Sequence, residues 1–473
     1  MYWTFVAKPA RRRLLRVIVL SLVLVALAAG AYALFAPPRR PALLSAEGRC
    51  RLGAYRLEDG TLFVVRQREG ESLRAVFFDG FGPALYPDDD AGRYVSQATT
   101  ADGKTPAAVA EFAPCAEGTV RVTLGGEPAR TARRTAFEQV TTTFRQAGVE
   151  LAGRLVLPPG KGRVPVVVLV HGSERDSALD GEGWQFLLPA SGIAAFVYDK
   201  RGTGRSGGVY TQDFHLLAAD AVAAAAEARR LAGPRLGELG FFGGSQGGWI
   251  APLAALEDGA DFVIAAYGLA ESPLAEDREE VLLGLREAGY DDEATRRKAL
   301  EVTNATGRVM ASHFRSGWKE LAAVEARYRD EPWLEAIDGE FSGDFLRYPS
   351  WLLRLVGPFF DVGTSWDYDP LPTLAYIEAP HLWVLAGEDH DAPSDTTLVH
   401  LRALQALRPN LDVARFPHAH HGILVPERAP DGHVLAWNHA PGYHALIVDW
   451  LRTKSLASAA PGIETWEGGN ARP

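Results

Sequence analysis

The feature that most constrains this chain is the segment GGSQGG at residues 243–248, which sets a serine between glycines in a Gly-x-Ser-x-Gly pattern. Apolar residues precede it at 239–242 and follow it at 249–251, so the pattern predicts a strand, a sharp turn and a helix. In such a turn, side chains at Gly243 and Gly247 would collide with the neighbouring strand and helix. The Ser245 hydroxyl is then expected to project from the sheet edge at a helix N-terminus, where negative charge is favoured. Ser245 is therefore the candidate nucleophile.

Residues 137–270 and 377–456 have the pattern of one α/β domain divided into two parts. Apolar runs typical of strands lie at residues 149–157, 164–170, 193–198, 239–242, 262–267, 382–385 and 413–416, and an alanine-rich helical stretch covers 216–231. Strands that alternate with helices predict a doubly wound, mostly parallel α/β sheet. Residues 271–376 interrupt this pattern with amphipathic segments at 279–300 and 318–328, which predict a helical lid over the strand ends.

The first 40 residues contain seven Lys and Arg and no acid, and residues 17–36 contain no charged residue. An apolar run of this length is about what a helix needs to cross the hydrocarbon core of a bilayer. We predict a transmembrane signal anchor in residues 1–40; a cleaved secretory signal ending near Ala31-Tyr32-Ala33 is the alternative. Because most basic residues precede the apolar run, the rest of the chain is expected to be exported, for example to a periplasm.

Residues 41–136 alternate short apolar runs with turn signals, which predicts a small β-rich domain, whereas residues 457–473 show no periodicity and predict a loose tail. The two cysteines, Cys50 and Cys115, can form one disulfide in an exported protein, and two buried free thiols fit the sequence equally well. The net charge is −10 even with the basic N-terminal segment included. Such an acidic chain excludes nucleic acid as an expected partner.

Four segments together resemble the α/β-hydrolase superfamily, and more closely its exported serine esterases and serine aminopeptidase-like hydrolases related to the bile-acid acyltransferase/thioesterases. They are VHGS at 170–173, YDKRGTGRSG at 198–207, GGSQGG at 243–248, and GED at 387–389 with Pro393 and a downstream HHG at 420–422. The resemblance covers residues 140–455. It implies an α/β-hydrolase fold with a lid insertion and the chain order nucleophile, acid, histidine.

A serine hydroxyl attacks well only when a base removes its proton and a carboxylate orients that base. In the implied chain order, the acid follows the strand at 382–385. Asp389 lies four residues before Pro393, as in the family's loop, and is the preferred acid. The glycine of GED lies one residue closer to it than in the common pattern, so Asp391 stays as the alternative acid.

The base is expected after the strand at 413–416, where His418, His420 and His421 stand close together. His421 directly precedes Gly422, as in the family's His-Gly pair, and is chosen as the base. The three imidazoles also suggest a metal site, but no carboxylate or cysteine is placed to complete one. We therefore expect neither a metal nor an organic cofactor.

An ester carbonyl that becomes tetrahedral needs two N–H donors, which the resemblance places after the nucleophile and after the preceding parallel strand. Those donors are the backbone N–H of Gln246 and that of Ser173 or Glu174. The segment at 199–204 lacks the ending of a phosphate-binding loop, so Asp199 and Arg201 are expected to pair and brace the loop.

These features predict a serine hydrolase that cleaves acyl bonds, most of all carboxylic esters, through a Ser-His-Asp triad and an acyl-enzyme. A serine aminopeptidase acting on short peptides is one alternative, because carboxylates at the start of the lid can hold a substrate's amino group: Glu276, Asp277, Glu279 and Glu280. A solvated face is the structural interpretation of the same run. A catalytically silent binding scaffold on this fold is the third hypothesis.

Overall fold

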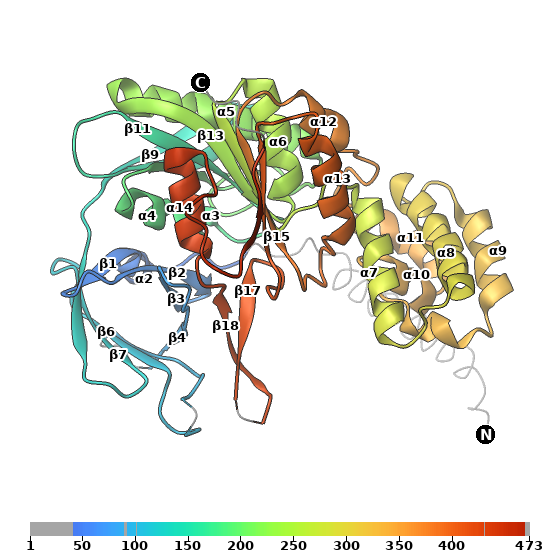
Figure 1. Cartoon of the computed structure of the whole chain (residues 1–473), viewed down its shortest axis with the longest axis horizontal. Helices are drawn as coiled ribbons and strands as arrows, with labels where there is room; N and C mark the ends of the chain where they lie inside the picture. Colours follow the sequence, from blue (N-terminus) through green and yellow to red (C-terminus); the bar gives the residue numbers. More distant parts are fainter. Residues whose placement is uncertain (1–40, 89–91, 101, 430, 469–473) are drawn as a thin grey trace, which may run out of the picture.

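The computed structural model describes residues 41–88, 92–100, 102–429 and 431–468. Its centre is a nine-stranded sheet in the order β19-β16-β15-β14-β13-β11-β12-β10-β9 (Figure 1). The strands are β9 (Glu138–Gln146), β10 (Val149–Leu157), β11 (Val164–Val170), β12 (Ala194–Tyr198), β13 (Leu236–Gly244), β14 (Phe262–Ala266), β15 (His381–Ala386), β16 (Leu411–Phe416) and β19 (Glu464–Trp466). The six central strands are parallel, which confirms the predicted doubly wound sheet.

Helices cover both faces of the sheet and bury its apolar strands on both sides. One face is covered by α5 (Phe214–Ala232), α6 (Gly247–Asp258), α12 (Leu371–Tyr376) and α13 (Asp395–Gln405), with the short η1 (Gly233–Arg235) after α5. The other face is covered by α3 (Ala178–Gly181), α4 (Trp184–Ala190) and α14 (Tyr443–Thr453). Alanines at positions such as 221, 224, 225 and 228 of α5 are fully buried, because small side chains allow close packing on the sheet.

An eight-stranded antiparallel barrel precedes the sheet in the chain and is closed by pairing of its first and last strands. Its strands are β1 (Gly53–Leu57), β2 (Leu62–Glu69), β3 (Ser72–Phe77), β4 (Ala84–Pro87), β5 (Arg93–Val95), β6 (Ala108–Phe112), β7 (Thr119–Leu124) and β8 (Arg130–Arg134). Buried and less buried residues alternate along β6, as expected for a strand with one face toward a core. A disulfide between Cys50 and Cys115 joins helix α2 (Ala46–Arg51) to the barrel.

The barrel is fused to the sheet by one continuous hydrophobic core. Barrel residues such as Phe63 belong to the same buried cluster as Phe186 of α4 and Trp450 of α14. A hairpin of β17 (Leu424–Arg428) and β18 (Val434–His439) also reaches the barrel, where His439 N donates to the carbonyl of Gly80 over 2.9 Å. The barrel is therefore packed firmly against the hydrolase sheet, and Figure 1 shows it below the sheet.

The segment between β14 and β15 folds into a helical layer on the other side of the strand ends (Figure 1). It contains α7 (Pro273–Glu287), α8 (Glu293–Ala311), α9 (Trp318–Tyr328), η2 (Pro332–Ala336), α10 (Ser342–Arg347) and α11 (Ser350–Phe360), which we call the lid. The single helix predicted over 279–300 is wrong. Gly289, with φ +87°, follows the end of α7, and the Asp292 side chain caps α8 by accepting from the N–H groups of Ala294 and Thr295.

Two predictions concern the chain ends. Within the described ranges, no helix has the length and apolar character that a membrane span requires, and the predicted anchor at 17–36 lies outside them. The prediction of a loose tail over 457–473 is wrong in part, because β19 pairs with β16 at the sheet edge. The Trp466 carbonyl accepts a hydrogen bond from Gln405 Nε2, and Arg402 lies over the Trp466 ring, so tertiary contacts hold this aperiodic segment.

Candidate active site

Ser245 lies at the sharp turn between β13 and α6, as the sequence predicts. Its φ of +53° is the left-handed conformation that side chains rarely adopt, and its N–H is held by the carbonyl of Ala266 at 3.0 Å. A Cβ at Gly243 would lie 2.1 Å from the carbonyl oxygen of Gly247, and one at Gly247 would lie 2.7 Å from that of Val170. Both glycines are therefore required by the close approach of backbone segments around the serine.

The structure brings Ser245, His421 and Asp389 together from three separate loops. His421 Nε2 lies 3.0 Å from Ser245 Oγ, and His421 Nδ1 lies 3.0 and 3.2 Å from the two carboxylate oxygens of Asp389. Asp389 is buried, and its Oδ1 also accepts from the N–H groups of Asp391 and Ala392. This geometry can move a proton from the serine to an imidazole that a fixed carboxylate orients.

The electrostatic surroundings favour a protonated His421. Burial lowers its pKa, but the hydrogen bond and charge of Asp389 act in the opposite direction, and Asp391 and Glu174 add to them. The net result is a pKa raised from the usual 6.5. An imidazole of this kind is a stronger base toward the Ser245 hydroxyl than an isolated histidine.

The other residues considered for acid and base point elsewhere. His418 Nδ1 lies 3.1 Å and His420 Nε2 lies 3.6 Å from oxygens of Glu388, so both imidazoles belong to a separate, more exposed group. Asp391 is exposed and meets Asp389 only through its backbone N–H. Within the described parts of the chain, His, Cys, Asp and Glu side chains form no group of three suited to a metal ion.

The two predicted oxyanion donors are available. Among the described residues, the N–H groups of Ser173 and Gln246 donate no hydrogen bond to the protein, and Gln246 directly precedes α6. The loop that carries Ser173 is braced from behind: Lys200 Nζ donates to the Gly172 carbonyl at 2.5 Å, and Tyr210 Oη donates to the Ser173 carbonyl at 2.6 Å. Fixed carbonyls also fix the direction of the neighbouring N–H groups, as an oxyanion site requires.

The expected pairing of Asp199 with Arg201 does not occur. Arg201 instead forms a buried ion pair with Asp220 of α5. Asp199 accepts from the Ser177 hydroxyl at 2.8 Å and from the Arg205 N–H at 2.7 Å. Sequence proximity was misleading here because the loop directs neighbouring side chains into different layers of the fold.

The carboxylates at the start of the lid are not a uniformly solvated face. Asp277 is fully buried and accepts from the N–H groups of Phe341 and Ser342 and from the Ser342 hydroxyl at 2.6–3.0 Å, which ties α7 to α10. Burial raises the pKa of Glu276 well above its usual value, and the nearby charges of Glu280, Glu340 and Asp389 raise it further. Glu276 belongs to α7 of the lid, and its carboxyl is within electrostatic reach of Asp389.

Sequence reasoning missed two features of the site. One is Tyr267, whose backbone has the left-handed φ of +40°. Its ring contacts the His421 ring edge-on, with 5.2 Å between the ring centroids. A cavity of about 230 Å³ lies between the barrel and the loop after β11, and Arg66 of β2 lines it. No local pattern announces either feature, because both depend on contacts between distant segments.

Comparison with known proteins gives one family match. A model of the Alpha/beta hydrolase family matches residues 167–434. No curated protein matches the sequence significantly. Similar solved structures include an esterase of Pyrococcus furiosus (15% identity, 60% of this chain and 83% of that one, TM-score 0.38). An acylaminoacyl peptidase of Pyrococcus horikoshii is also similar, with 15% identity over 86% of this chain and 60% of that one and a TM-score of 0.42. A proline iminopeptidase of Mycobacterium smegmatis has 16% identity over 67% of this chain and 100% of that one, with a TM-score of 0.37.

Proposed function

Because the chain belongs to the alpha/beta hydrolase family, we propose that it is a serine hydrolase that cleaves carboxylic esters through an acyl-enzyme. The observation that carries the proposal is the continuous contact from Ser245 Oγ to His421 Nε2 at 3.0 Å and from His421 Nδ1 to Asp389 at 3.0 Å. An ester is the preferred substrate because its cleavage requires no group beyond these and the two backbone donors.

In the first step, Ser245 Oγ bonds to the ester carbonyl carbon while its proton passes to His421 Nε2. The N–H groups of Gln246 and Ser173 stabilise the resulting oxyanion. When the tetrahedral intermediate collapses, the bond to the alcohol breaks and His421 gives its proton to the leaving oxygen. Water then attacks the acyl carbon while His421 Nε2 takes its proton. The bond to Ser245 Oγ breaks, the carboxylic acid leaves, and His421 returns the proton to the serine oxygen.

Active-site labelling tests the proposal directly. A fluorophosphonate probe is expected to label the wild-type protein, and the Ser245→Ala variant is expected to remain unlabelled. Ser245→Ala and His421→Ala should each reduce hydrolysis of a 4-nitrophenyl ester by about 10⁴-fold or more while the circular dichroism spectrum stays unchanged. A folded wild-type protein that neither takes the label nor turns over the ester would favour the silent binding scaffold.

The acid assignment has its own matched pair. Asp389→Asn should lower kcat by about 10⁴-fold, because the amide stabilises the wrong imidazole tautomer. Asp391→Asn removes a charge of the same type two residues away and should keep most of the activity. The reverse result would make Asp391 the acid.

A serine aminopeptidase is the second candidate, and the position of Glu276 favours it. This half-buried carboxylate lies near Asp389, on the side of the active site that the lid covers. In this function Glu276 would hold a substrate's protonated amino group. Peptide and ester assays run in parallel, with Glu276→Gln compared to wild type, separate the two functions. Turnover of alanyl anilides alone, lost in Glu276→Gln, would replace the esterase assignment.

We also propose that residues 1–40 hold the enzyme at a membrane with its catalytic part exported. The uncharged run at 17–36 and the Cys50–Cys115 disulfide, which suits an oxidising compartment, support this proposal. Full-length protein is expected in the carbonate-resistant membrane fraction, and a chain that begins at Pro41 in the soluble fraction. Full-length protein recovered from the soluble cytoplasmic fraction would contradict the proposal.

A further inference from the structure

The cavity of about 230 Å³ is built jointly by the barrel and the hydrolase sheet. Arg66 enters from β2, Glu174 from the loop after β11, and Trp184 from α4. Gly244, the residue before the nucleophile, and Tyr267, which contacts His421, also line it. The volume far exceeds the roughly 10–15 Å³ that accommodates one water, so a substrate group of several heavy atoms fits beside the triad.

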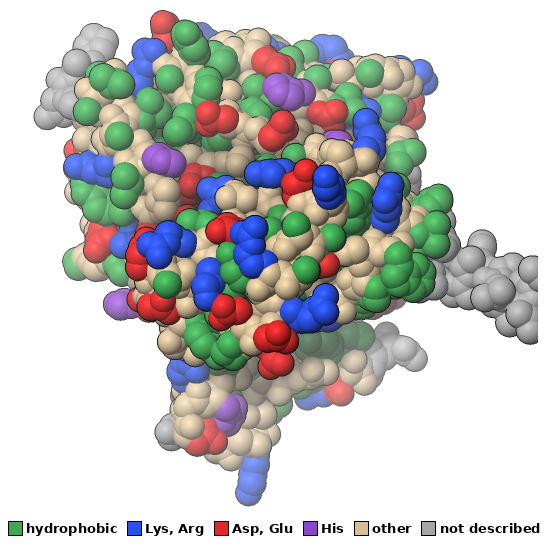
Figure 2. Space-filling view, turned by 90° about the vertical axis from the view of Figure 1, so that its right-hand side faces the viewer, with side chains coloured by type: hydrophobic (Ala, Val, Ile, Leu, Met, Phe, Trp, Pro, Cys, Tyr) green, Lys and Arg blue, Asp and Glu red, His purple; other side chains and the backbone are tan. Residues whose placement is uncertain are grey.

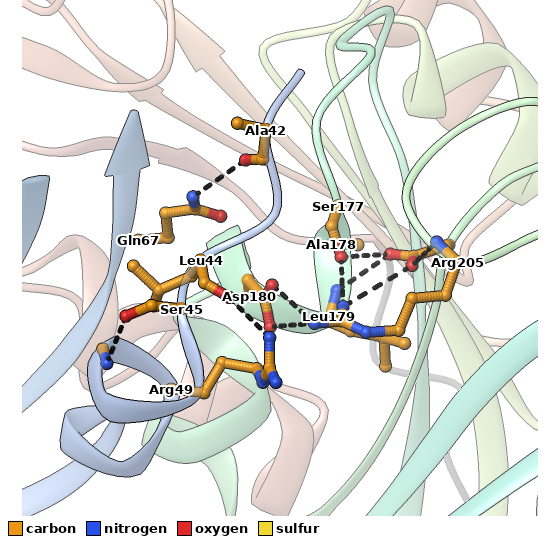
Figure 3. Close-up of polar contacts among 12 residues, drawn as sticks. Ala42, Leu44, Ser45, Arg49, Gln67, Ser177, Ala178, Leu179, Asp180 and Arg205 are labelled. Atoms are coloured by element: carbon orange, nitrogen blue, oxygen red, sulfur yellow. Dashed lines mark hydrogen bonds and ion pairs between the residues drawn. The ribbon is translucent and has the colours of Figure 1, made fainter. Parts of the chain in front are cut away.

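Some of the polar walls are fixed by the protein itself. Gln67 Nε2 donates to the carbonyls of Ala42 and Gly70, at 3.4 and 2.8 Å. Ser177, at the start of α3, accepts from Arg205 Nη1 at 2.9 Å. Figure 3 shows the contact of Gln67 with Ala42 on one side of the region where the barrel meets α3, and Ser177 with Arg205 on the other. The Gln67 amide N–H groups and the Ser177 hydroxyl, which also donates to Asp199, are held in place by these hydrogen bonds.

Two of the histidines that line the cavity are buried and uncharged. His171 Nε2 and His439 Nδ1 are shielded from solvent and lack a hydrogen-bond partner among the described residues. Burial, with the charge of Lys200, lowers the pKa of His171 to about 3, and burial lowers that of His439 well below its usual range. Both rings are therefore neutral near pH 7.

The cavity is lined by charged groups of both signs, and among the described residues these groups form no close ion pair with one another. Arg66 Nη1 donates to the carbonyls of Gln67 and Gly181, both at 3.1 Å, and no described carboxylate lies within ion-pairing distance of this guanidinium. Glu182 accepts from the Trp184 N–H at 2.9 Å, and the Glu174 carboxylate folds back over Gly172. The lining includes three carboxylates, Glu174, Asp176 and Glu182, and two guanidiniums, Arg66 and Arg68. An anionic ligand would meet the carboxylates, and a cationic ligand would meet the arginines.

We propose that this cavity binds a neutral group rich in hydroxyls, such as one sugar ring, so that the enzyme's substrates are acylated sugars. The proposal rests on the serine hydrolase function proposed above. A hydroxyl is the group that suits this lining, because it donates one hydrogen bond and accepts two. It can donate to Glu174 and Glu182 and accept from Arg66. Trp184 provides an apolar wall for the ring carbons.

Calorimetric titration of Ser245→Ala protein tests binding without any turnover. Methyl α-D-glucopyranoside is the neutral probe, succinate the anionic probe and L-alaninamide the cationic probe. We expect the glucoside alone to bind. Its affinity should fall about tenfold or more when Arg66→Met or Glu182→Gln is added, and remain unchanged with Arg121→Met, an exposed barrel arginine paired with Glu111. Arg66→Lys keeps the charge but loses the planar fork, and should bind as weakly as Arg66→Met if folding is intact.

Preferential binding of succinate or alaninamide, or of no probe, would overturn the proposal. A second measurement compares kcat/KM for acetylated methyl glucoside with kcat/KM for 4-nitrophenyl acetate. Arg66→Met should lower the ratio of the two about tenfold or more, and Arg121→Met should leave it unchanged. A protein that binds the glucoside but hydrolyses neither ester would contradict the proposed function and leave the binding site standing. A protein that hydrolyses both esters but binds no glucoside would contradict the binding site and leave the proposed hydrolase function standing.

Discussion

The barrel and the lid flank the same strand ends but are attached to the sheet in different ways (Figure 1). The barrel shares one buried hydrophobic cluster with α4, α14 and the sheet. The lid has two clusters of its own, both made of residues between Leu274 and Trp366. Continuous apolar packing makes the barrel and the hydrolase sheet one cooperative unit, whereas separate cores allow the lid to open by itself.

The polar contacts and the exposed side chains also differ between the barrel and the lid. Polar contacts join the lid to the sheet domain at its two ends, where Trp249 Nε1 donates to the Glu271 carbonyl at 2.7 Å and Gln212 N to the Val362 carbonyl at 3.0 Å. A further contact lies at the end of α7, where Glu287 is 3.5 Å from His390 Nε2. Figure 2 shows basic and acidic side chains interleaved over the lid, with hydrophobic side chains gathered at one edge. Exposed Trp351 and Leu355 of α11 belong to the lid, whereas equivalent large residues of the barrel are buried. We therefore assign cavity shape to the barrel and access to the lid.

Matched core truncations are the strongest way to break this contrast. Phe63→Ala in the barrel core should lower the free energy of global unfolding by about 3–5 kcal/mol, because its ring packs between Tyr55 and Phe77 in the shared cluster. Phe345→Ala removes an equally buried ring from a lid cluster. It should destabilise the lid and leave the main denaturant transition nearly unchanged. Hydrogen exchange resolved by segment measures both, and equal global losses would contradict the contrast.

Removing the disulfide is the next largest change. The double variant Cys50→Ala/Cys115→Ala frees a loop with a sequence separation of 65 residues, which should cost about 2–4 kcal/mol of barrel stability. Because the barrel and the sheet share a core, the main thermal transition should move down as a whole. Reduced wild-type protein is the control. A separate low-temperature transition for the barrel alone would show that the two are not one unit.

Two glycines with positive φ provide a finer comparison. A Cβ at Gly80 would lie 2.2 Å from the carbonyl of His439, at the contact that holds the hairpin after His421. Gly80→Ala should therefore cost about 1–3 kcal/mol and lower kcat/KM for a small ester about tenfold, through a displaced His421. Gly289→Ala in the lid has open space around its Cβ and should cost only about 1 kcal/mol, with unchanged kcat/KM. If Gly80→Ala and Gly289→Ala had equal effects on kcat/KM, the barrel would not position His421.

The smallest expected effect concerns pH. The proposed mechanism needs neutral His421, so activity should rise as pH rises through a pKa above 6.5. Glu174 in the loop facing the barrel and Asp391 near the lid both raise that pKa. Glu174→Gln and Asp391→Asn should each move the acidic limb of the pH–rate profile to lower pH by about a few tenths of a unit. Glu111→Gln on the barrel surface is the control, and a shift to higher pH would contradict the assignment.

The sequence predicted the parts of this protein that depend on local pattern. The strained serine was predictable because Gly243 and Gly247 are the residue type such a turn requires, and the structure has Ser245 at φ +53°. The parallel sheet followed from apolar runs separated by helical segments. The break between α7 and α8 was missed although Gly289 and Asp292 are local signals, because the apolar periodicity on both sides was treated as one helix.

Other features required the folded chain. The family's His-Gly pair singled out His421 among three nearby histidines, but the sequence did not predict that His418 and His420 turn to Glu388. The burial of Glu276, the pairing of Arg201 with Asp220, and the cavity that Arg66 lines also depend on segments far apart in the chain. Local pattern determines backbone conformation because it acts through neighbours along the chain. Side-chain partners are decided by distances through space, which only the packed tertiary structure sets.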